Sequence, residues 1–162
     1  MIYIISPTES HLTNRGKRHP DLANYLVNNG HDVIYISSNF NHAQKKLISD
    51  KELLSYKQDY ESFFIKNGRY KKNISLRRVF WNYMFSLKCY NYLDQKNLSI
   101  NDILIIPSRP PELIYYTSKL KKKYGCKIIL DIRDVWPDSF VSTGLLAKFF
   151  KLYCDFFQKK SV

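Results

Sequence analysis

The chain has 162 residues, of which 44% are hydrophobic and 25% charged, so it can bury the core of one domain and is not a disordered segment. No stretch approaches the roughly 20 apolar residues that cross a bilayer, and the first apolar run is too short for a signal peptide, so we expect a cytoplasmic protein. The net charge of +12 favours anionic partners, which include nucleic acid, anionic lipid and phosphate-bearing substrates.

The cysteines and histidines give no sign of a metal site. Cys89, Cys126 and Cys154 are far apart, odd in number and form no C-x-x-C pair, so we interpret them as reduced packing residues. The four histidines also fall at spacings that indicate no metal site. We therefore expect neither a metal nor a bound cofactor.

In the first half of the chain, hydrophobic periodicity predicts strands that alternate with helices. Residues 1–5 form a continuous apolar run, which is typical of a strand covered on both faces. A helix is predicted over residues 21–29 and a second strand over residues 33–37. Residues 39–60 are polar and only weakly helical, and residues 61–66 are predicted to form a third short strand.

The second half continues the same alternation. Ser75 can cap a long helix, Pro110 and Pro111 suit the first turn of the next helix, and Gly125 ends it. In chain order the predicted elements are a helix over residues 76–93, a strand over 102–106, a helix over 110–124, a strand over 127–130 and a helix over 145–158.

Strand, helix and strand repeated in this way imply parallel pairing and right-handed crossovers. The predicted fold is therefore α/β, a Rossmann-like doubly wound parallel sheet in three α/β/α layers, formed by residues 1–162 as a single domain. Such sheets bind ligands beyond the carboxyl ends of their strands. The segments to examine follow Ile5, Ile36, Ile106 and Leu130.

The glycines argue against the familiar nucleotide-binding fingerprints. The five glycines never fall at G-x-G-x-x-G or P-loop spacing, which argues against a dehydrogenase, a kinase or an ATPase. Gly16, however, lies in the sequence R-G-K-R-H, directly ahead of a predicted helix. Gly16 permits close backbone approach, the helix start offers free amides, and Lys17 and Arg18 add charge, so a phosphate can bind there. The alternative is a solvated basic loop.

A second polar segment, D-I-R-D-V-W-P-D-S, follows the last predicted strand at residues 131–139. Its three carboxylates and one arginine would be costly to place at a strand end without pairing or a ligand, so we favour a functional role. The alternative is an ion pair between Asp131 and Arg133 that stiffens the turn, with Trp136 filling the core.

These two segments, together with D-L-A-N-Y-L-V-N-N-G-H-D-V at residues 21–33, resemble a known family. They are similar to the amino-terminal domain of retaining glycosyltransferases of family four, particularly those of bacterial capsule and O-antigen synthesis. The resemblance spans almost the whole chain and implies the GT-B architecture, in which two Rossmann-like domains face a cleft. The first domain holds the acceptor and the second holds chiefly the nucleotide sugar.

By this resemblance, residues 1–162 are the acceptor-binding domain. The family's second domain carries a paired-glutamate donor motif, E-x7-E, which this sequence lacks. The donor-binding half would then belong to a longer protein or to a separate subunit, and the chain alone would be inactive. The implied reaction transfers a glycosyl group, with retention of configuration, from a nucleotide-sugar donor to a saccharide or lipid-linked acceptor.

The resemblance also implies roles for single residues. The segment from Gly16 to His19 is similar to the family's glycine-rich loop near the reacting phosphates, although Lys17 stands where the family often has a second glycine. Arg133 and Asp134 are similar to the family's pair at the sugar-transfer centre, so Asp134 is the best candidate to contact the transferred sugar or the acceptor hydroxyl. Further candidates for substrate or phosphate binding are Arg18, Ser108, Arg109, Asp131, Trp136 and Asp138.

Contact with a membrane is predicted for residues 66–78. This segment contains six cations and no acidic residue, and aromatic residues follow it in the sequence. Charge attraction and interfacial aromatic insertion could together hold the domain at the inner face of the plasma membrane. A solvated loop beside a core-facing helix is the alternative. The candidate membrane contacts are Lys66, Arg69, Lys71, Lys72, Arg77, Arg78 and Trp81.

Two further expectations concern partners. A basic α/β module that binds nucleic acid is the competing hypothesis, but an RNP-like aromatic motif and a helix-turn-helix are missing, so we expect no nucleic acid. The last predicted helix carries four phenylalanines that would pack against the donor domain or another partner. They are Phe149, Phe150, Phe156 and Phe157.

Overall fold

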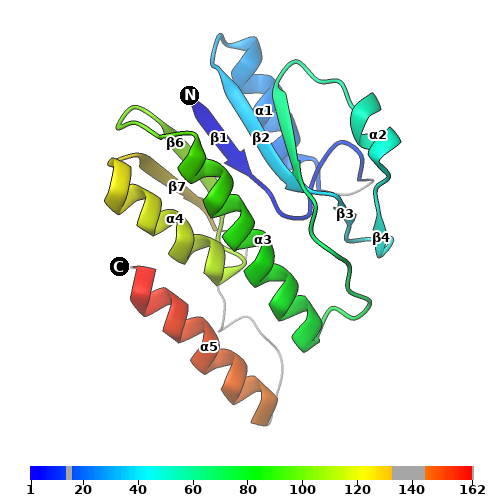
Figure 1. The fold of residues 1–162 in the computed structure, drawn as a ribbon, viewed down its shortest axis with the longest axis vertical. Coiled ribbons are helices and arrows are strands. Elements are labelled where there is room, and N and C mark those ends of the chain that lie inside the picture. Colours follow the sequence, from blue (N-terminus) through cyan, green and yellow to red (C-terminus); the bar gives the residue numbers. More distant parts are fainter. Residues whose placement is uncertain (14–15, 133–144, 162) are drawn as a thin grey trace.

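The computed structural model describes residues 1–13, 16–132 and 145–161, and its centre is a parallel sheet (Figure 1). The sheet has five strands in the order β5-β2-β1-β6-β7, and the pairings between neighbours are all parallel. The predicted α/β class with a doubly wound parallel sheet is therefore confirmed. The strands are β1 (Ile2–Ile5), β2 (Val33–Ser38), β5 (Glu61–Ile65), β6 (Ile103–Pro107) and β7 (Lys127–Asp131).

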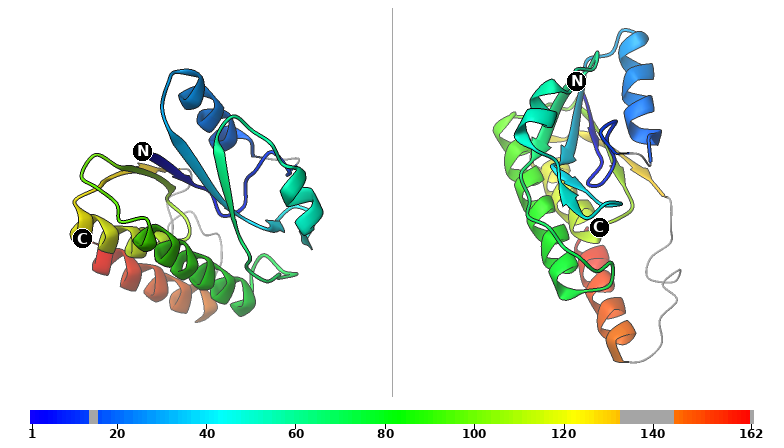
Figure 2. Two further views of the ribbon diagram at one scale, coloured as in Figure 1. Left: turned by 45° about the horizontal axis from the view of Figure 1, so that its top comes forward. Right: turned by 90° about the vertical axis from the view of Figure 1, so that its right-hand side faces the viewer.

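Helices cover both faces of the sheet, which gives the three predicted layers (Figure 2). On one face lies α1 (Arg18–Asn28), and on the other lie α3 (Leu76–Gln95) and α4 (Pro111–Tyr124). The last helix, α5 (Leu145–Ser161), packs on α4. Each crossover returns the chain to the same end of the sheet, so the carboxyl ends of all five strands share one edge.

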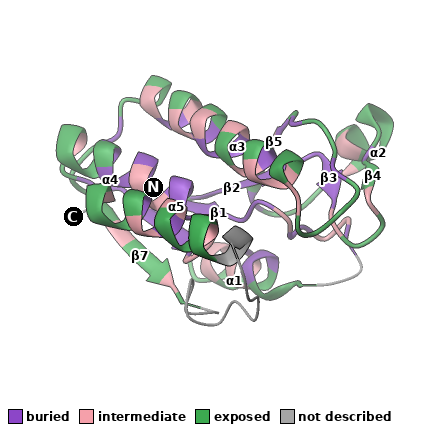
Figure 3. Cartoon of the chain, turned by 90° about the horizontal axis from the view of Figure 1, so that it is seen from below, coloured by how far each residue is buried: buried purple, intermediate pink, exposed green. Residues whose placement is uncertain are grey.

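The central strand, β1, joins two hydrophobic clusters on opposite faces of the sheet. Ile4 and Ile5 are both fully buried. Ile4 packs with Ala23 and Tyr35 under α1, whereas Ile5 belongs to the larger cluster that includes Phe85 of α3. Burial of each isoleucine contributes about 2 kcal/mol, so the continuous apolar run accounts for the central position of β1. At the sheet edge, by contrast, β7 has only exposed and half-buried residues (Figure 3).

The start of α1 differs from the prediction. The helix begins at Arg18 and not at Asp21, because Pro20 is tolerated in a first turn, where its missing N–H has no partner to lose. Lys17 is the residue that precedes the helix. Arg18 and His19 therefore belong to the first turn of α1 and not to the preceding loop.

Residues 39–60 contain two features that the periodicity did not reveal. A short antiparallel hairpin joins β3 (Phe40–Asn41) to β4 (Lys46–Leu47), and one short helix, α2 (Asp50–Ser55), follows. A capping box starts α2: the Ser49 hydroxyl accepts a hydrogen bond from the Glu52 N–H at 3.3 Å, and the Glu52 carboxylate accepts one from the Ser49 N–H at 2.8 Å. The sequence S-x-x-E at this point was the signal for the helix.

The predicted start of α3 and the predicted start and end of α4 are confirmed. The Ser75 hydroxyl accepts a hydrogen bond from the N–H of Arg78 at 3.2 Å, which caps α3. Helix α4 begins at Pro111 and ends at its C-cap, Gly125. The φ of Gly125 is +72°, which lies in the left-handed region.

The cysteines are buried packing residues, as predicted. Cys89, Cys126 and Cys154 are all buried and unpaired. Burial raises the pKa of Cys154 to about 12, so the thiol stays protonated and unreactive at neutral pH. Within residues 1–13, 16–132 and 145–161, no group of three or more His, Cys, Asp or Glu side chains is arranged to hold a metal ion.

The aromatic face of α5 divides into a buried and an exposed part. Phe157 is only 8% exposed and packs against Tyr115 and Tyr153, with ring centroids 5.5 and 5.1 Å away. The expectation that Phe157 packs against another domain is therefore wrong. Phe149 and Phe156, on the outer side of α5, remain exposed.

A buried carboxyl group lies between α4 and α5. The Glu112 side chain is fully buried, and its Oε1 accepts a hydrogen bond from the hydroxyl of Tyr153. Its second oxygen, Oε2, has no hydrogen-bond partner among the described residues. Burial raises the pKa of Glu112 above its ordinary value, because the ionised form loses its hydration there.

This raised pKa predicts that neutral pH destabilises the fold through Glu112. A carboxyl whose pKa is higher in the folded than in the unfolded chain contributes stability below the unfolded pKa, and that stability is lost as the pH rises through the folded pKa. Glu112→Gln keeps the acceptor for Tyr153 and cannot ionise. As the pH rises and Glu112 ionises, we expect the free energy of unfolding of Glu112→Gln to increase relative to that of the native chain. The increase should be at most about 1.4 kcal/mol per pH unit.

The measurement is urea unfolding of both chains between pH 4 and pH 8. Asp59→Asn, which removes an exposed carboxylate, is the control and should follow the native curve. Parallel curves for Glu112→Gln and the native chain would contradict the assignment.

Candidate functional site

A pocket lies at the carboxyl edge of the sheet, where the strand order reverses. From β1 the chain goes to β2 and β5 on one side, and it then returns to β6 and β7 on the other. The loops after β1 and β6 therefore diverge, which is where doubly wound sheets bind ligands. The pocket has a volume of about 100 Å³ and is lined by residues 6–9, residues 107–110, Arg78 and Asn82. We call it the switch-point pocket, and it includes Ser108 and Arg109, both predicted as binding residues.

The two polar segments singled out in the sequence meet beside this pocket. Asp131, the last residue of β7, forms an ion pair with Arg18, with 2.7 Å between Oδ1 and Nη2. Its other oxygen lies 3.1 Å from Nε2 of His19. The segment from Gly16 to His19 and the start of the 131–139 segment are therefore adjacent in space. Arg133, Asp134, Trp136 and Asp138 lie outside the described residues.

Both the backbone conformation at residue 16 and the nearby Glu9 side chain require a glycine there. Its φ of +69° lies in the left-handed region, and a Cβ built on it would lie 2.8 Å from side-chain atoms of Glu9. The Glu9 carboxylate, in turn, lies 3.6 Å from Nδ1 of His19. Arg18 and His19 thus face carboxylates, and Arg18 and Lys17 are both exposed. Phosphate binding by this segment stays a prediction.

Hydrogen bonds from β2 fix the loop between β1 and α1. The hydroxyls of Tyr35 and Ser37 both donate to the carbonyl oxygen of Glu9 at 2.8 Å, and the hydroxyl of Ser38 donates to the carbonyl of Pro7 at 2.6 Å. All three donors are buried. These hydroxyls are not among the predicted site residues, although hydroxyls at the end of a buried strand indicate that hydrogen-bond partners are near. The loop thereby presents Glu9 to both the switch-point pocket and His19.

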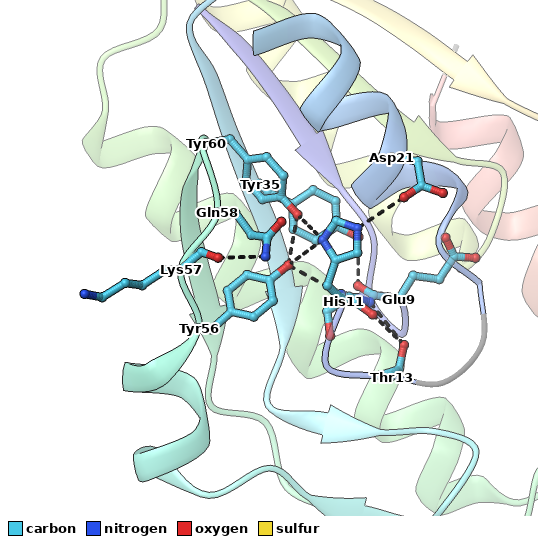
Figure 4. Close-up of polar contacts among 10 residues, drawn as sticks. Glu9, His11, Thr13, Asp21, Tyr35, Tyr56, Lys57, Gln58 and Tyr60 are labelled. Atoms are coloured by element: carbon cyan, nitrogen blue, oxygen red, sulfur yellow. Dashed lines mark hydrogen bonds and ion pairs between the residues drawn. The ribbon is translucent and has the colours of Figure 1, made fainter. Parts of the chain in front are cut away.

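His11 anchors the same loop from its other side (Figure 4). Its Nδ1 lies 3.1 Å from the hydroxyl of Tyr56 and 3.0 Å from that of Tyr60, and its Nε2 lies 3.2 Å from a carboxylate oxygen of Asp21. Burial raises the pKa of both tyrosines, so their hydroxyls remain protonated at neutral pH. This network ties the loop to α1 and to the segment before β5.

The basic segment at residues 66–78 divides into several environments. The prediction for Trp81 is wrong: its indole is only 4% exposed, and its N–H donates to the carbonyls of Asn67 and Gly68, so it is a core residue. Lys66 is exposed but forms an ion pair with Asp50 at 2.8 Å. The other four exposed cations of this segment are Arg69, Lys71, Lys72 and Arg77.

Arg78 also differs from the prediction, because it is half-buried and lines the switch-point pocket. Membrane contact is predicted for Arg78 from the run of cations and the aromatic residues that follow it. Helical phase separates Arg78 from its exposed neighbour Arg77, because successive residues of a helix point about 100° apart.

Comparison of the chain with models of protein families finds no match, and comparison with curated proteins finds none either. The candidate site accordingly rests on the placement of its own residues at the carboxyl edge of the sheet. None of the described helices is both long and apolar enough to cross a bilayer.

Gly16→Ala provides a test of the loop geometry. We expect a loss of about 2 kcal/mol in the free energy of unfolding, because alanine is strained at this φ and its Cβ displaces Glu9. In a Glu9→Ala background the same substitution should cost only about 1 kcal/mol, since the displacement no longer occurs.

Chemical unfolding of the four chains of this cycle gives the coupling between Gly16 and Glu9. Gly68→Ala is the control, because nothing lies near its Cβ position, and it should change the free energy of unfolding by less than about 0.5 kcal/mol. Equal losses from Gly16→Ala with and without Glu9 would show that the two residues are not in contact.

Proposed function

We propose that the chain is the acceptor-binding domain of a retaining, nucleotide-sugar-dependent glycosyltransferase with GT-B architecture, which acts in the synthesis of a bacterial surface polysaccharide. The observation that carries the proposal is the meeting of Asp131 with Arg18 and His19 beside the switch-point pocket. These two segments bear the family resemblance, and they lie at the edge where such sheets bind ligands. The donor site belongs, in this proposal, to a second domain or subunit.

The chemistry assigned to this edge is electrostatic and positional. Transfer from a nucleotide sugar releases a nucleoside diphosphate, whose charge is stabilised by cations and backbone amides fixed in advance. Lys17 and Arg109 are the cations proposed for this role at the described part of the edge. Asp134, with Arg133 beside it in the sequence, is proposed to position the acceptor hydroxyl. Ser108 supplies a hydroxyl for the acceptor in the switch-point pocket.

A lipid-linked acceptor fits the surface around the start of α3. Three apolar side chains project there: Ile74 is 71% exposed, Leu76 86% and Phe80 64%. The exposed cations of residues 66–78 surround them in the sequence, and each cation near an anionic bilayer contributes about 1 kcal/mol. We propose that Phe80 and Leu76, in place of Trp81, enter the interfacial region of the inner leaflet while the cations bind lipid headgroups.

Vesicle binding tests both parts of the proposal. The chain should sediment with vesicles of phosphatidylcholine and phosphatidylglycerol and not with phosphatidylcholine alone. Lys71→Gln combined with Lys72→Gln should weaken binding roughly 30-fold at low salt, which corresponds to about 1 kcal/mol for each lysine. When the vesicles also carry a monosaccharide linked to a prenyl diphosphate, amide hydrogen exchange should slow at residues 6–9 and 107–110.

The matched control is Lys121→Gln combined with Lys127→Gln, which removes the same charge from two other exposed sites. An equal loss of binding in the control would reject the proposed membrane surface, as would a preference for single-stranded RNA at physiological salt. Unchanged exchange at residues 6–9 and 107–110 would reject the acceptor site.

A further inference from the structure

We propose that Lys45 and Arg78 form a binding site for a phosphoryl group, presented either by a soluble phosphate or by a lipid headgroup. This site lies between the β3–β4 hairpin and α3, and it is separate from the proposed transfer centre at Asp131 and Gly16. Four residues build it, namely Lys45 of the hairpin, Tyr70 and Asn73 of the following loop, and Arg78 of α3.

One aromatic ring brings the two cations together. The Lys45 ammonium lies 4.9 Å from the centroid of the Tyr70 ring, and the Arg78 guanidinium carbon lies 5.7 Å from it. Tyr70 is itself fixed in the core, where it is 1% exposed and packs against Phe40 and Trp81. Because the ring is rigidly held, the two cations stay near each other although they come from different elements.

Asn73 holds both cations by separate atoms. Its side-chain oxygen accepts a hydrogen bond from Lys45 at 2.5 Å, and its backbone oxygen accepts one from Arg78 Nη1 at 2.9 Å. These are neutral acceptors. Within the described residues neither Lys45 nor Arg78 forms an ion pair. The site therefore carries two positive charges with which no carboxylate of the described chain forms a direct ion pair.

Arg78 retains capacity to donate. Its Nε is buried and has no hydrogen-bond partner in the part of the chain that the structure describes. An orphaned donor of a charged group is costly to bury, and an oxyanion that accepts from it would remove that cost. Arg78 also lines the switch-point pocket, so a bound anion would lie beside that pocket.

The pKa of His42, which lies beside Lys45, reflects the positive potential of this site. Nδ1 of His42 lies 3.3 Å from the Lys45 ammonium and is hydrogen-bonded to the hydroxyl of Tyr70. Burial, Lys45 and Arg78 together lower the pKa of His42 to about 4. Burial and Arg78 likewise lower the pKa of Lys45. An anion between the cations would favour the protonated imidazole and raise the pKa of His42.

The backbone conformation of Lys45 supports a role for its side chain in binding an anion. Lys45 has a φ of +58°, which glycine and asparagine adopt at lower cost than lysine. The hairpin turn is otherwise held by Asn41, whose side-chain oxygen accepts from the N–H groups of Ala43 and Gln44 at 3.1 Å. A lysine at this strained position places its ammonium group on the side chain of Asn73, whose backbone oxygen accepts from Arg78.

The test titrates the full chain with inorganic phosphate and follows the His42 imidazole by NMR. Phosphate should bind in a saturable manner and raise the pKa of His42. Arg78→Gln and Lys45→Gln should each weaken binding about tenfold, the loss of one charge-assisted hydrogen bond, and Arg78→Lys should weaken it less. The matched control Lys46→Gln, adjacent to Lys45 in sequence and exposed, should change binding less than about twofold.

A second arm distinguishes the sources of the phosphoryl group. Vesicles that contain phosphatidic acid, a phosphate monoester, should compete with free phosphate if a headgroup is the ligand, and they should not compete if the ligand is soluble. The proposal is overturned if the native chain binds neither form, or if Lys46→Gln loses as much affinity as Arg78→Gln and Lys45→Gln. Since the first arm needs no lipid, acceptor or donor, its result is independent of the glycosyltransferase proposal.

Discussion

The contact of Asp131 with Arg18 and His19 is the constraint on which the candidate site depends. It joins the end of the last strand to the first turn of the first helix, although the two are far apart in the chain. The His19 side chain is only 2% exposed, and its two ring nitrogens lie 3.6 Å from a carboxylate oxygen of Glu9 and 3.1 Å from one of Asp131. Because Glu9 also lines the switch-point pocket, this contact fixes the pocket relative to the end of β7.

Side chains in the first turns of α3 point in three directions, because successive residues of a helix are about 100° apart. Leu76 and Phe80 project outward, where a bilayer would contact them, and Trp81 fills the core. Arg78 points between these directions, towards Tyr70 and the switch-point pocket. A phosphoryl group at Lys45 and Arg78 would therefore lie between the proposed membrane surface and the proposed acceptor pocket. One helix thus relates the proposed membrane contact, the proposed anion site and the proposed acceptor pocket.

The sequence predicted the strands and long helices because burial on one or both faces leaves a periodic pattern, as in residues 1–5 and α3. It also placed the Gly16 segment and the 131–139 segment after strands of one parallel sheet, whose carboxyl ends share an edge, and Asp131 contacts Arg18 and His19 at that edge. It did not predict β3 and β4, because two-residue strands are too short to show a period. Nor could it separate Arg77 from Arg78, or place the Tyr35 hydroxyl on Glu9, since these depend on helical phase and on the path of a loop.

A double-mutant cycle between His19 and Asp131 tests this constraint most directly. His19→Gln and Asp131→Asn preserve approximate shape while they weaken the contact, and chemical unfolding gives the free energy of each chain. We expect the two substitutions to be coupled by about 1 to 3 kcal/mol. Losses that add within about 0.5 kcal/mol would show that the residues act independently, and the site would lose the contact that assembles it.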